Sequence, residues 1–261
     1  MRKPAVAGQF YPNSRDKLYD FFNSIKFFQE RQNSYGLIVP HAGYIFSGET
    51  AFKTFYSTEI HDLVIILCPN HRGVGKPIGV SFEDWETPLG VINTDKKIAS
   101  FIVEHSDAEE DELSHKFEHS LEVQLPIIQF FKPNVKIVAI SIGTLNINST
   151  NTIVNVIENV CKENKCLPVA SSDMSHFVPA KIAETLDSKV IEKLKILDSD
   201  GMLKTVIDNN ISMCGVGPAY VVTKLAKKLG AKKGEVIEYT NSGKVTNDYS
   251  DVVAYLGMRF V

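Results

Sequence analysis

Residues 37–48, with the sequence LIVPHAGYIFSG, decide the fold. The apolar run at 37–39 predicts a short buried strand, and Pro40 ends it. His41 follows where the chain must turn toward the next element. The pattern therefore places an imidazole at the carboxyl end of a strand.

Two further segments repeat this arrangement. An apolar run at 63–68 precedes His71, and another at 167–172 precedes His176. In open α/β sheets, ligands bind at the carboxyl ends of the strands. We therefore expect these histidines and the one at position 41 to lie at one edge of a sheet.

The run at 63–68 is apolar throughout, which is typical of a parallel strand buried on both faces. Helical patterns alternate with strand patterns along the chain, and neither a repeat nor a linker interrupts them. The length of 261 residues and the hydrophobic content of 44% suit a sizeable core. We expect one α/β domain over residues 1–261, with three layers, a central mostly parallel sheet and helices on both faces.

Charge and hydropathy exclude several classes of partner. The net charge is −3, and the 28 basic residues are scattered, so no nucleic-acid footprint is predicted. No apolar run resembles a signal peptide or a membrane span. The expectation is a cytoplasmic protein that binds neither nucleic acid nor membrane.

The four cysteines do not form a CxxC motif. Cys68 lies in a buried-strand pattern, so a disulfide framework is not expected, and the pairing of Cys161 with Cys166 is left open. Cys214 precedes a predicted helix. A thiol at a helix N-terminus is biased toward thiolate, which makes Cys214 the better ligand or nucleophile.

These residues suggest a metal site. His41, His71 and Cys214 supply two imidazoles and a thiolate, a set that suits iron, zinc or copper. His176 adds a further group, and Asp173 is placed to orient a neighbouring histidine. A lone histidine at a strand end is usually structural, whereas for three in equivalent places a shared site and separate structural roles are both left open.

The segment HKFEH at 115–119 offers an alternative. A helix is predicted over 114–131, kinked or divided at Pro126, and it would place His115 and His119 on one face with Glu118 as a potential base. This order matches inverted zincin metalloproteases. Pocket-lining or surface histidines are the commoner outcome for so short a pattern. The glycines of the loop at 69–79 lack the spacing of a phosphate-binding loop.

Seven motifs occur in the order seen in one family. They are PAVAGQFYP, PHAGYIFSG, PNHRG, WETPLG, EHSLEVQLP, SSDMSHF and a turn with Cys214, Gly215, Gly217 and Pro218. From residue 4 to about residue 220 the chain thus resembles the MEMO family. That family is similar in fold to class III extradiol dioxygenases, non-haem iron enzymes that open catechol rings. The resemblance implies an α/β domain with a metal pocket.

The resemblance also implies roles for single residues. By motif, the metal ligands fall on His41, His71 and Cys214. His176 matches the acid and base of the related dioxygenases, with Asp173 beside it as a second catalytic candidate. The remaining motif residues are expected to line the substrate pocket; they are Tyr44, Glu118 and His119. His115 belongs to no family motif, so HKFEH is interpreted as accidental.

Three functions follow as hypotheses. The first is an oxidoreductase that uses Fe(II), or else copper or zinc, on a small aromatic or other redox substrate. The second is a non-catalytic module that binds metal or a peptide, and the family's frequent pairing with a radical-SAM protein in microbes suggests a modification system. The third is a hydrolase that uses HKFEH. Ring cleavage is not inherited by fold alone, because Cys214 stands where the oxygenases have a carboxylate.

Overall fold

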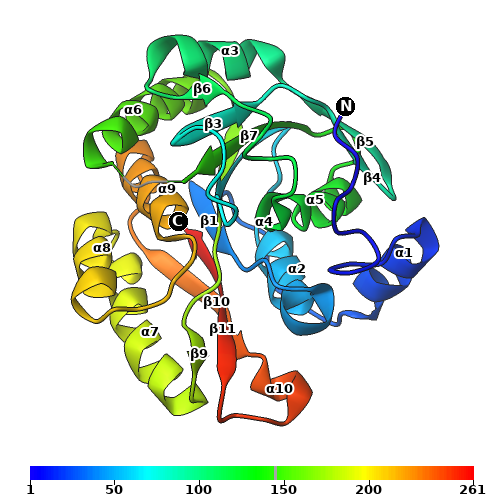
Figure 1. The fold of residues 1–261 in the computed structure, drawn as a ribbon, viewed down its shortest axis with the longest axis vertical. Coiled ribbons are helices and arrows are strands. Elements are labelled where there is room, and N and C mark those ends of the chain that lie inside the picture. Colours follow the sequence, from blue (N-terminus) through cyan, green and yellow to red (C-terminus); the bar gives the residue numbers. More distant parts are fainter. Residues whose placement is uncertain (144–145) are drawn as a thin grey trace.

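The computed structural model describes residues 1–143 and 146–261, and within them 11 strands form one sheet (Figure 1). The strands are β1 (Gly36–Val39), β2 (Leu63–Pro69), β3 (Ile78–Ser81), β4 (Trp85–Thr87), β5 (Gly90–Thr94), β6 (Glu109–Glu110), β7 (Lys136–Ile142), β8 (Cys166–Ser171), β9 (His176–Val178), β10 (Gly234–Asn241) and β11 (Val252–Phe260). The order is β10-β11-β1-β8-β2-β7-β3-β6, with β4, β5 and β9 paired off this path.

Helices cover both faces of this sheet (Figure 1). They are α1 (Arg15–Ser24), the π-helical turn η1 (Tyr44–Gly48), α2 (Glu49–Tyr56), α3 (Lys96–His105), α4 (His119–Glu122), α5 (Leu125–Phe131), α6 (Ile147–Glu163), α7 (Ala180–Lys195), α8 (Ser199–Asp208), α9 (Val216–Leu229) and α10 (Gly243–Thr246). Helices α3 and α6 to α9 contribute to one buried cluster, and α1, α2, α4 and α5 to the other. Within the described residues, none of the helices is long and apolar enough to cross a membrane.

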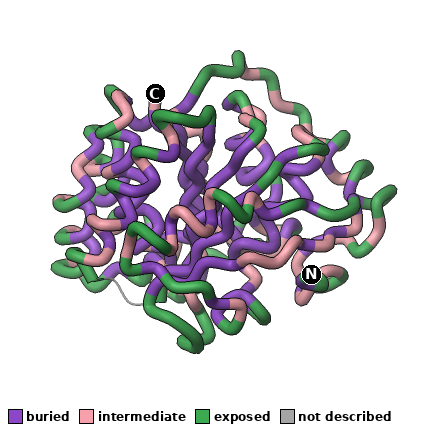
Figure 2. Tube along the Cα trace, turned by 90° about the horizontal axis from the view of Figure 1, so that it is seen from above, coloured by how far each residue is buried: buried purple, intermediate pink, exposed green. Residues whose placement is uncertain are grey.

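Strand β2 shows why the sheet lies between two cores. All seven of its residues are buried. Ile65 and Leu67 pack into the first cluster, whereas Val64 and Ile66 pack into the second, as the alternation of side chains along a strand requires. Figure 2 shows the buried residues in the middle of the trace and the exposed ones around it. The prediction of an α/β fold with a mostly parallel sheet between helices is confirmed.

Three neighbouring strands set the position of the candidate site. β1 pairs with β8, and β8 pairs with β2, in both cases in parallel. Their carboxyl ends therefore meet at one edge of the sheet. The loops that leave this edge carry His41 after β1, His71 after β2 and Asp173 after β8.

The prediction of a helix over 114–131 is wrong for residues 114–118, whereas the rest of the segment is divided into two helices. Residues 114–117 form turns, α4 begins at His119 and α5 begins at Leu125. Glu118 is the N-cap of α4, and its side chain accepts from the amide N–H of Ser120. Pro126 occupies the first turn of α5, where its missing N–H costs nothing, so the segment is divided just before Pro126 and is not kinked there. HKFEH is therefore not a helical motif.

A disulfide joins Cys161 in α6 to Cys166 at the start of β8, so the pairing left open by the sequence does form. Cys68 and Cys214 are free.

Replacing both Cys161 and Cys166 by serine is expected to lower the free energy of unfolding by about 2 kcal/mol, because a loop with a sequence separation of 5 is short and its closure restricts the unfolded chain only modestly. Chemical denaturation without reductant measures this difference. As a control, reductant should shift the wild type to the stability of the double variant and leave that variant unchanged. A stability equal to that of the wild type would contradict the prediction.

Candidate metal centre

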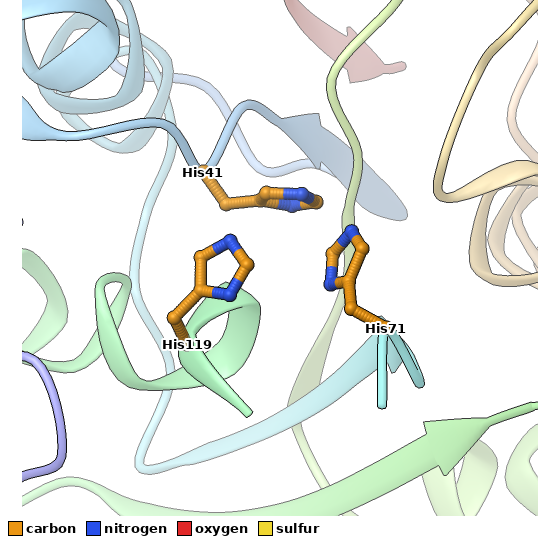
Figure 3. Close-up of side chains that lie close together, drawn as sticks. All are labelled: His41, His71 and His119. Atoms are coloured by element: carbon orange, nitrogen blue, oxygen red, sulfur yellow. The ribbon is translucent and has the colours of Figure 1, made fainter. Parts of the chain in front are cut away.

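Three histidines form the centre of the candidate site. His41, His71 and His119 each offer a ring nitrogen, and these nitrogens all lie within 4.8 Å of one another. His41 follows β1, His71 follows β2, and His119 opens α4. Figure 3 shows the rings of His71 and His119 side by side below the ring of His41. The parallel strands thus bring two of the histidines together, and α4 brings the third.

Glu118 orients the two rings that face His41. Its carboxylate accepts from Nδ1–H of His71 at 2.9 Å and lies 3.4 Å from Nδ1 of His119. Burial alone would raise the pKa of Glu118, but hydrogen bonds from His71 and Ser120 lower it to about 2. The carboxylate is therefore ionised at neutral pH. Because Nδ1–H of His71 donates to this carboxylate, Nε2 carries no proton and has a lone pair for a ligand. Metal-binding histidines usually donate their other ring N–H to a carboxylate in this way.

The tautomer of His41 follows from its hydrogen bonds. Ser171 Oγ donates to the carbonyl oxygen of Ser120 at 2.6 Å, so its only proton is used. It must therefore accept from Nδ1–H of His41, which lies 2.9 Å away. Gln124 supports this assignment, since its amide nitrogen donates to the carbonyl oxygen of Pro40 and to the same hydroxyl. Nε2 of His41 is then the atom with the free lone pair.

Cys214 lies on the other side of His41. Its Sγ is 3.2 Å from Nε2 of His41 and accepts from the backbone N–H of Asp173 at 3.3 Å. The carboxylate of Asp173 accepts from the backbone N–H of His41 at 2.7 Å. Burial raises the pKa of the Cys214 thiol, and burial also raises the pKa of Asp173, to about 7. Burial thus favours the protonated thiol, contrary to the thiolate bias expected from the position before a helix, and a bound cation would have to displace the thiol proton.

The ionisation of the histidines suits metal binding. Burial lowers the pKa of His41 well below its usual value, and it lowers the pKa of His119 to about 4. Both rings are neutral at pH 7, so they can donate lone pairs. Neutral imidazoles beside a thiol match the ligand preferences of iron, copper and zinc.

His176 lies at the edge of the site. Its Nδ1–H donates to the carbonyl oxygen of Ser212 at 2.8 Å, and its backbone N–H donates to the hydroxyl of the same residue. This leaves Nε2 unprotonated, and burial lowers the pKa of the ring. His176 is therefore a candidate base, as the sequence predicts, and its catalytic role stays a prediction.

Two cavities flank the histidines. One, of about 370 Å³, is lined by residues that include His71, Arg72 and His119. The other, of about 450 Å³, is lined by residues that include His119, Asp173 and His176. Both volumes are in the range of small-molecule sites. A ligand in either cavity would reach the three-histidine cluster.

The pocket residues expected from the motifs differ in position. His119 lines both cavities, whereas Glu118 is fully buried behind the rings. Tyr44 is buried in the second core, where its hydroxyl donates to the carbonyl oxygen of Val123. The structure thus brings His119 closer to the candidate metal position than the motifs indicate, and it places Tyr44 in a packing role.

The N-terminal arm is bound to the segment that carries Glu118. Arg2 is buried, and its guanidinium donates to the carboxylate of Glu122 at 2.7 Å and to the carbonyl oxygen of Glu118 at 2.9 Å. Further along the arm, the ring of Phe10 packs against His119, with 4.6 Å between the ring centroids. The sequence does not predict this contact, because the arm motif PAVAGQFYP and the segment EHSLE lie more than 100 residues apart.

His115 is buried outside the cluster. Its Nε2–H donates to the carbonyl oxygen of Gly79 at 3.1 Å, and its ring stands edge-on to Trp85. Within the described residues, the three-histidine cluster is the group that could hold a metal, and His115 is not in it. His115 therefore has a structural role.

Stability should depend on pH through His115. Burial lowers its pKa to about 4 in the folded protein, whereas the unfolded chain takes up a proton near pH 6.5. The unfolded state thus binds more protons between these values, and stability is lost as the pH falls from 6.5 toward 4. The total loss from this residue is about 3 kcal/mol. Denaturation of wild type and His115→Gln at several pH values measures it, and identical pH profiles would contradict it.

Comparisons with known proteins agree with the motifs. A family model described as "Memo-like protein" matches residues 2–259. A "MEMO1 family protein" of Aquifex aeolicus is 43% identical over 265 residues, covering 100% of this chain and 99% of the relative. Relatives with the same family description occur in Nitrosopumilus maritimus, at 38% identity with full coverage of both chains, and in Methanosarcina barkeri, at 37% with 98% of both covered.

Proposed function

Because the chain belongs to the MEMO family, we propose that it binds a transition-metal ion through His41, His71 and Cys214, with His119 beside the ion. One observation carries this proposal: hydrogen bonds fix the tautomers of His41 and His71 so that each has a free lone pair on Nε2. The ring nitrogens of these two histidines and of His119 also lie within 4.8 Å of one another, an arrangement to which the structural histidine His115 does not belong. We propose iron as the ion, with copper or zinc as alternatives.

One pair of donors in the proposed set has a spacing that suits such an ion. Sγ of Cys214 lies 3.2 Å from Nε2 of His41, which is close to the spacing of about 3.5 Å between a nitrogen and a sulfur ligand of one tetrahedral ion. The buried carboxylate of Glu118 balances part of the charge that the ion brings. A bound iron or copper ion would supply redox chemistry, and the protein would supply orientation and proton transfer.

We propose that the site acts on a small molecule as an oxidoreductase. The cavity of about 450 Å³ joins the cluster to His176, whose free Nε2 can accept a proton from a bound molecule. Asp173 lines the same cavity, and we propose that its carboxyl group exchanges a proton with the bound molecule. The binding of a peptide and a radical-SAM partner stays a prediction.

The metal content of anaerobically purified protein tests the proposal. We expect about one iron ion per chain in the wild type and almost none in His41→Ala. His41 is a ligand whether the third donor is Cys214 or His119. His105→Ala is the matched control, since it removes an exposed histidine from α3. A wild type without bound metal, or equal metal in both variants, would reject the site.

A separate measurement addresses the reaction. The iron-loaded protein is incubated with a panel of catechols and other small reductants while oxygen consumption and absorbance are followed. Oxygen uptake that disappears in His176→Ala is expected for an oxidoreductase. Bound iron without any uptake would instead favour the non-catalytic binding module.

A further inference from the structure

Phe177 occupies an irregular position beside His176. In the antiparallel pair of β9 and β11, Val178 lies opposite Val252 and His176 lies opposite Val253. One step along β11 therefore corresponds to two steps along β9. Phe177 is the extra residue of a β-bulge.

The backbone of Phe177 is in the left-handed region, with φ of 56°. A side chain with a Cβ is strained there, and bulges of this kind usually have glycine at this position. Leu197 has a similar φ, but it is 3% exposed, so its burial in the core offsets the strain. Phe177 is 76% exposed, so burial of its ring does not offset the backbone strain in the same way.

The bulge has a consequence for the cavity next to the histidine cluster. In a regular strand, consecutive side chains point to opposite faces. Here His176 and Phe177 both line the cavity of about 450 Å³. The other aromatic side chains that line it are Phe10, Phe46 and Tyr255. The bulge thus adds an exposed apolar ring to a wall that already holds the candidate base.

We propose that Phe177 is a ligand-contacting residue, and that the ligand is a small molecule whose flat apolar ring packs against Phe177 while its polar end faces His119, Asp173 and His176. This inference rests on the proposed function, because it assigns a substrate class to the same site. The aromatic lining supports a ring, since ring pairs gain more than their buried area provides. Bulges near functional sites commonly redirect a side chain in this way.

Two substitutions separate a ligand contact from a structural role. Phe177→Ala removes the ring and keeps the strained Cβ, whereas Phe177→Gly removes both. If the ring is held for ligand binding, Phe177→Gly should melt about 2–4 °C above Phe177→Ala and no lower than the wild type. If the ring instead stabilises the fold, both variants should melt well below the wild type, and the proposal fails.

Ring binding is then measured directly. Indole is titrated into protein that has been incubated with Fe(II) under anaerobic conditions, and binding is followed by ligand-observed NMR, with cyclohexanol as the non-aromatic control. We expect the Kd of indole to rise roughly three- to tenfold in Phe177→Ala and to be restored in Phe177→Tyr. An unchanged Kd in Phe177→Ala, or no binding of indole to the wild type, would overturn the proposal.

The metal content of the same samples keeps the two proposals apart. If the wild type binds no metal but its affinity for indole depends on Phe177, the metal proposal fails and the ring contact stands. If metal is bound and indole binding does not depend on Phe177, the ring contact fails alone.

Discussion

Replacing Glu122 by alanine is expected to lower the free energy of unfolding by about 3–5 kcal/mol. The carboxylate is fully buried and pairs with the guanidinium of Arg2 at 2.7 Å. It also accepts from the hydroxyl of Tyr11 at 2.7 Å and from the backbone N–H groups of Ala5 and Val6. The variant would leave a buried cation and three further donors without their acceptor. Urea denaturation at neutral pH measures the difference.

The control uses an ion pair on the same arm. Lys3 pairs with Glu86 at the surface, so Glu86→Ala is expected to cost less than about 1 kcal/mol. Glu122→Gln keeps one acceptor oxygen and should fall between the wild type and Glu122→Ala. If Glu122→Ala and Glu86→Ala were equally stable, the buried pair of Arg2 and Glu122 would not be what stabilises the N-terminal arm.

Much of the fold could be predicted from the sequence, because the central strands are buried on both faces. The apolar runs at 37–39, 63–68 and 167–172 each become a strand of the sheet core. Parallel pairing then brings their carboxyl ends together, and this places His41 close to His71. These features depend on the local pattern of apolar residues, which can be recognised in the sequence alone.

The rest of the site depends on contacts between distant segments. The periodicity over 114–131 looks helical, but Glu118 turns its side chain toward Ser120 and His71, so a new helix starts at His119. Because α4 begins at His119, this residue lies in the three-histidine cluster, whereas His115 lies outside it. The tautomer of His41 depends on Ser171 and on residues that it meets only after folding. No spacing rule in the sequence contains this information.

The three-histidine cluster and the family motifs suggest different third ligands. Replacing the true third ligand is expected to lower the affinity for the metal strongly. Geometry groups His119 with His41 and His71, whereas the motifs select Cys214. We expect Cys214→Ala to lower the affinity for Fe(II) by more than about 100-fold, since even residues that only support a ligand contribute 10–100-fold. His119→Ala should lower it less than about tenfold, because Nδ1 of His119 lies 3.4 Å from Glu118 and its ring is held less firmly. Competition with a chelator under anaerobic conditions measures both affinities.

Substitution with Co(II) adds a spectroscopic test of the same assignment. A thiolate ligand gives cobalt a near-ultraviolet charge-transfer absorption, whereas imidazoles do not. We expect this absorption in the wild type and in His119→Ala, and we expect its loss in Cys214→Ser, which keeps the size of the side chain but removes the soft donor. The opposite pattern would assign the third position to His119. The sulfur would then be a neighbour of the ion that accepts from the backbone N–H of Asp173, and the site would resemble the three-histidine centres that favour zinc.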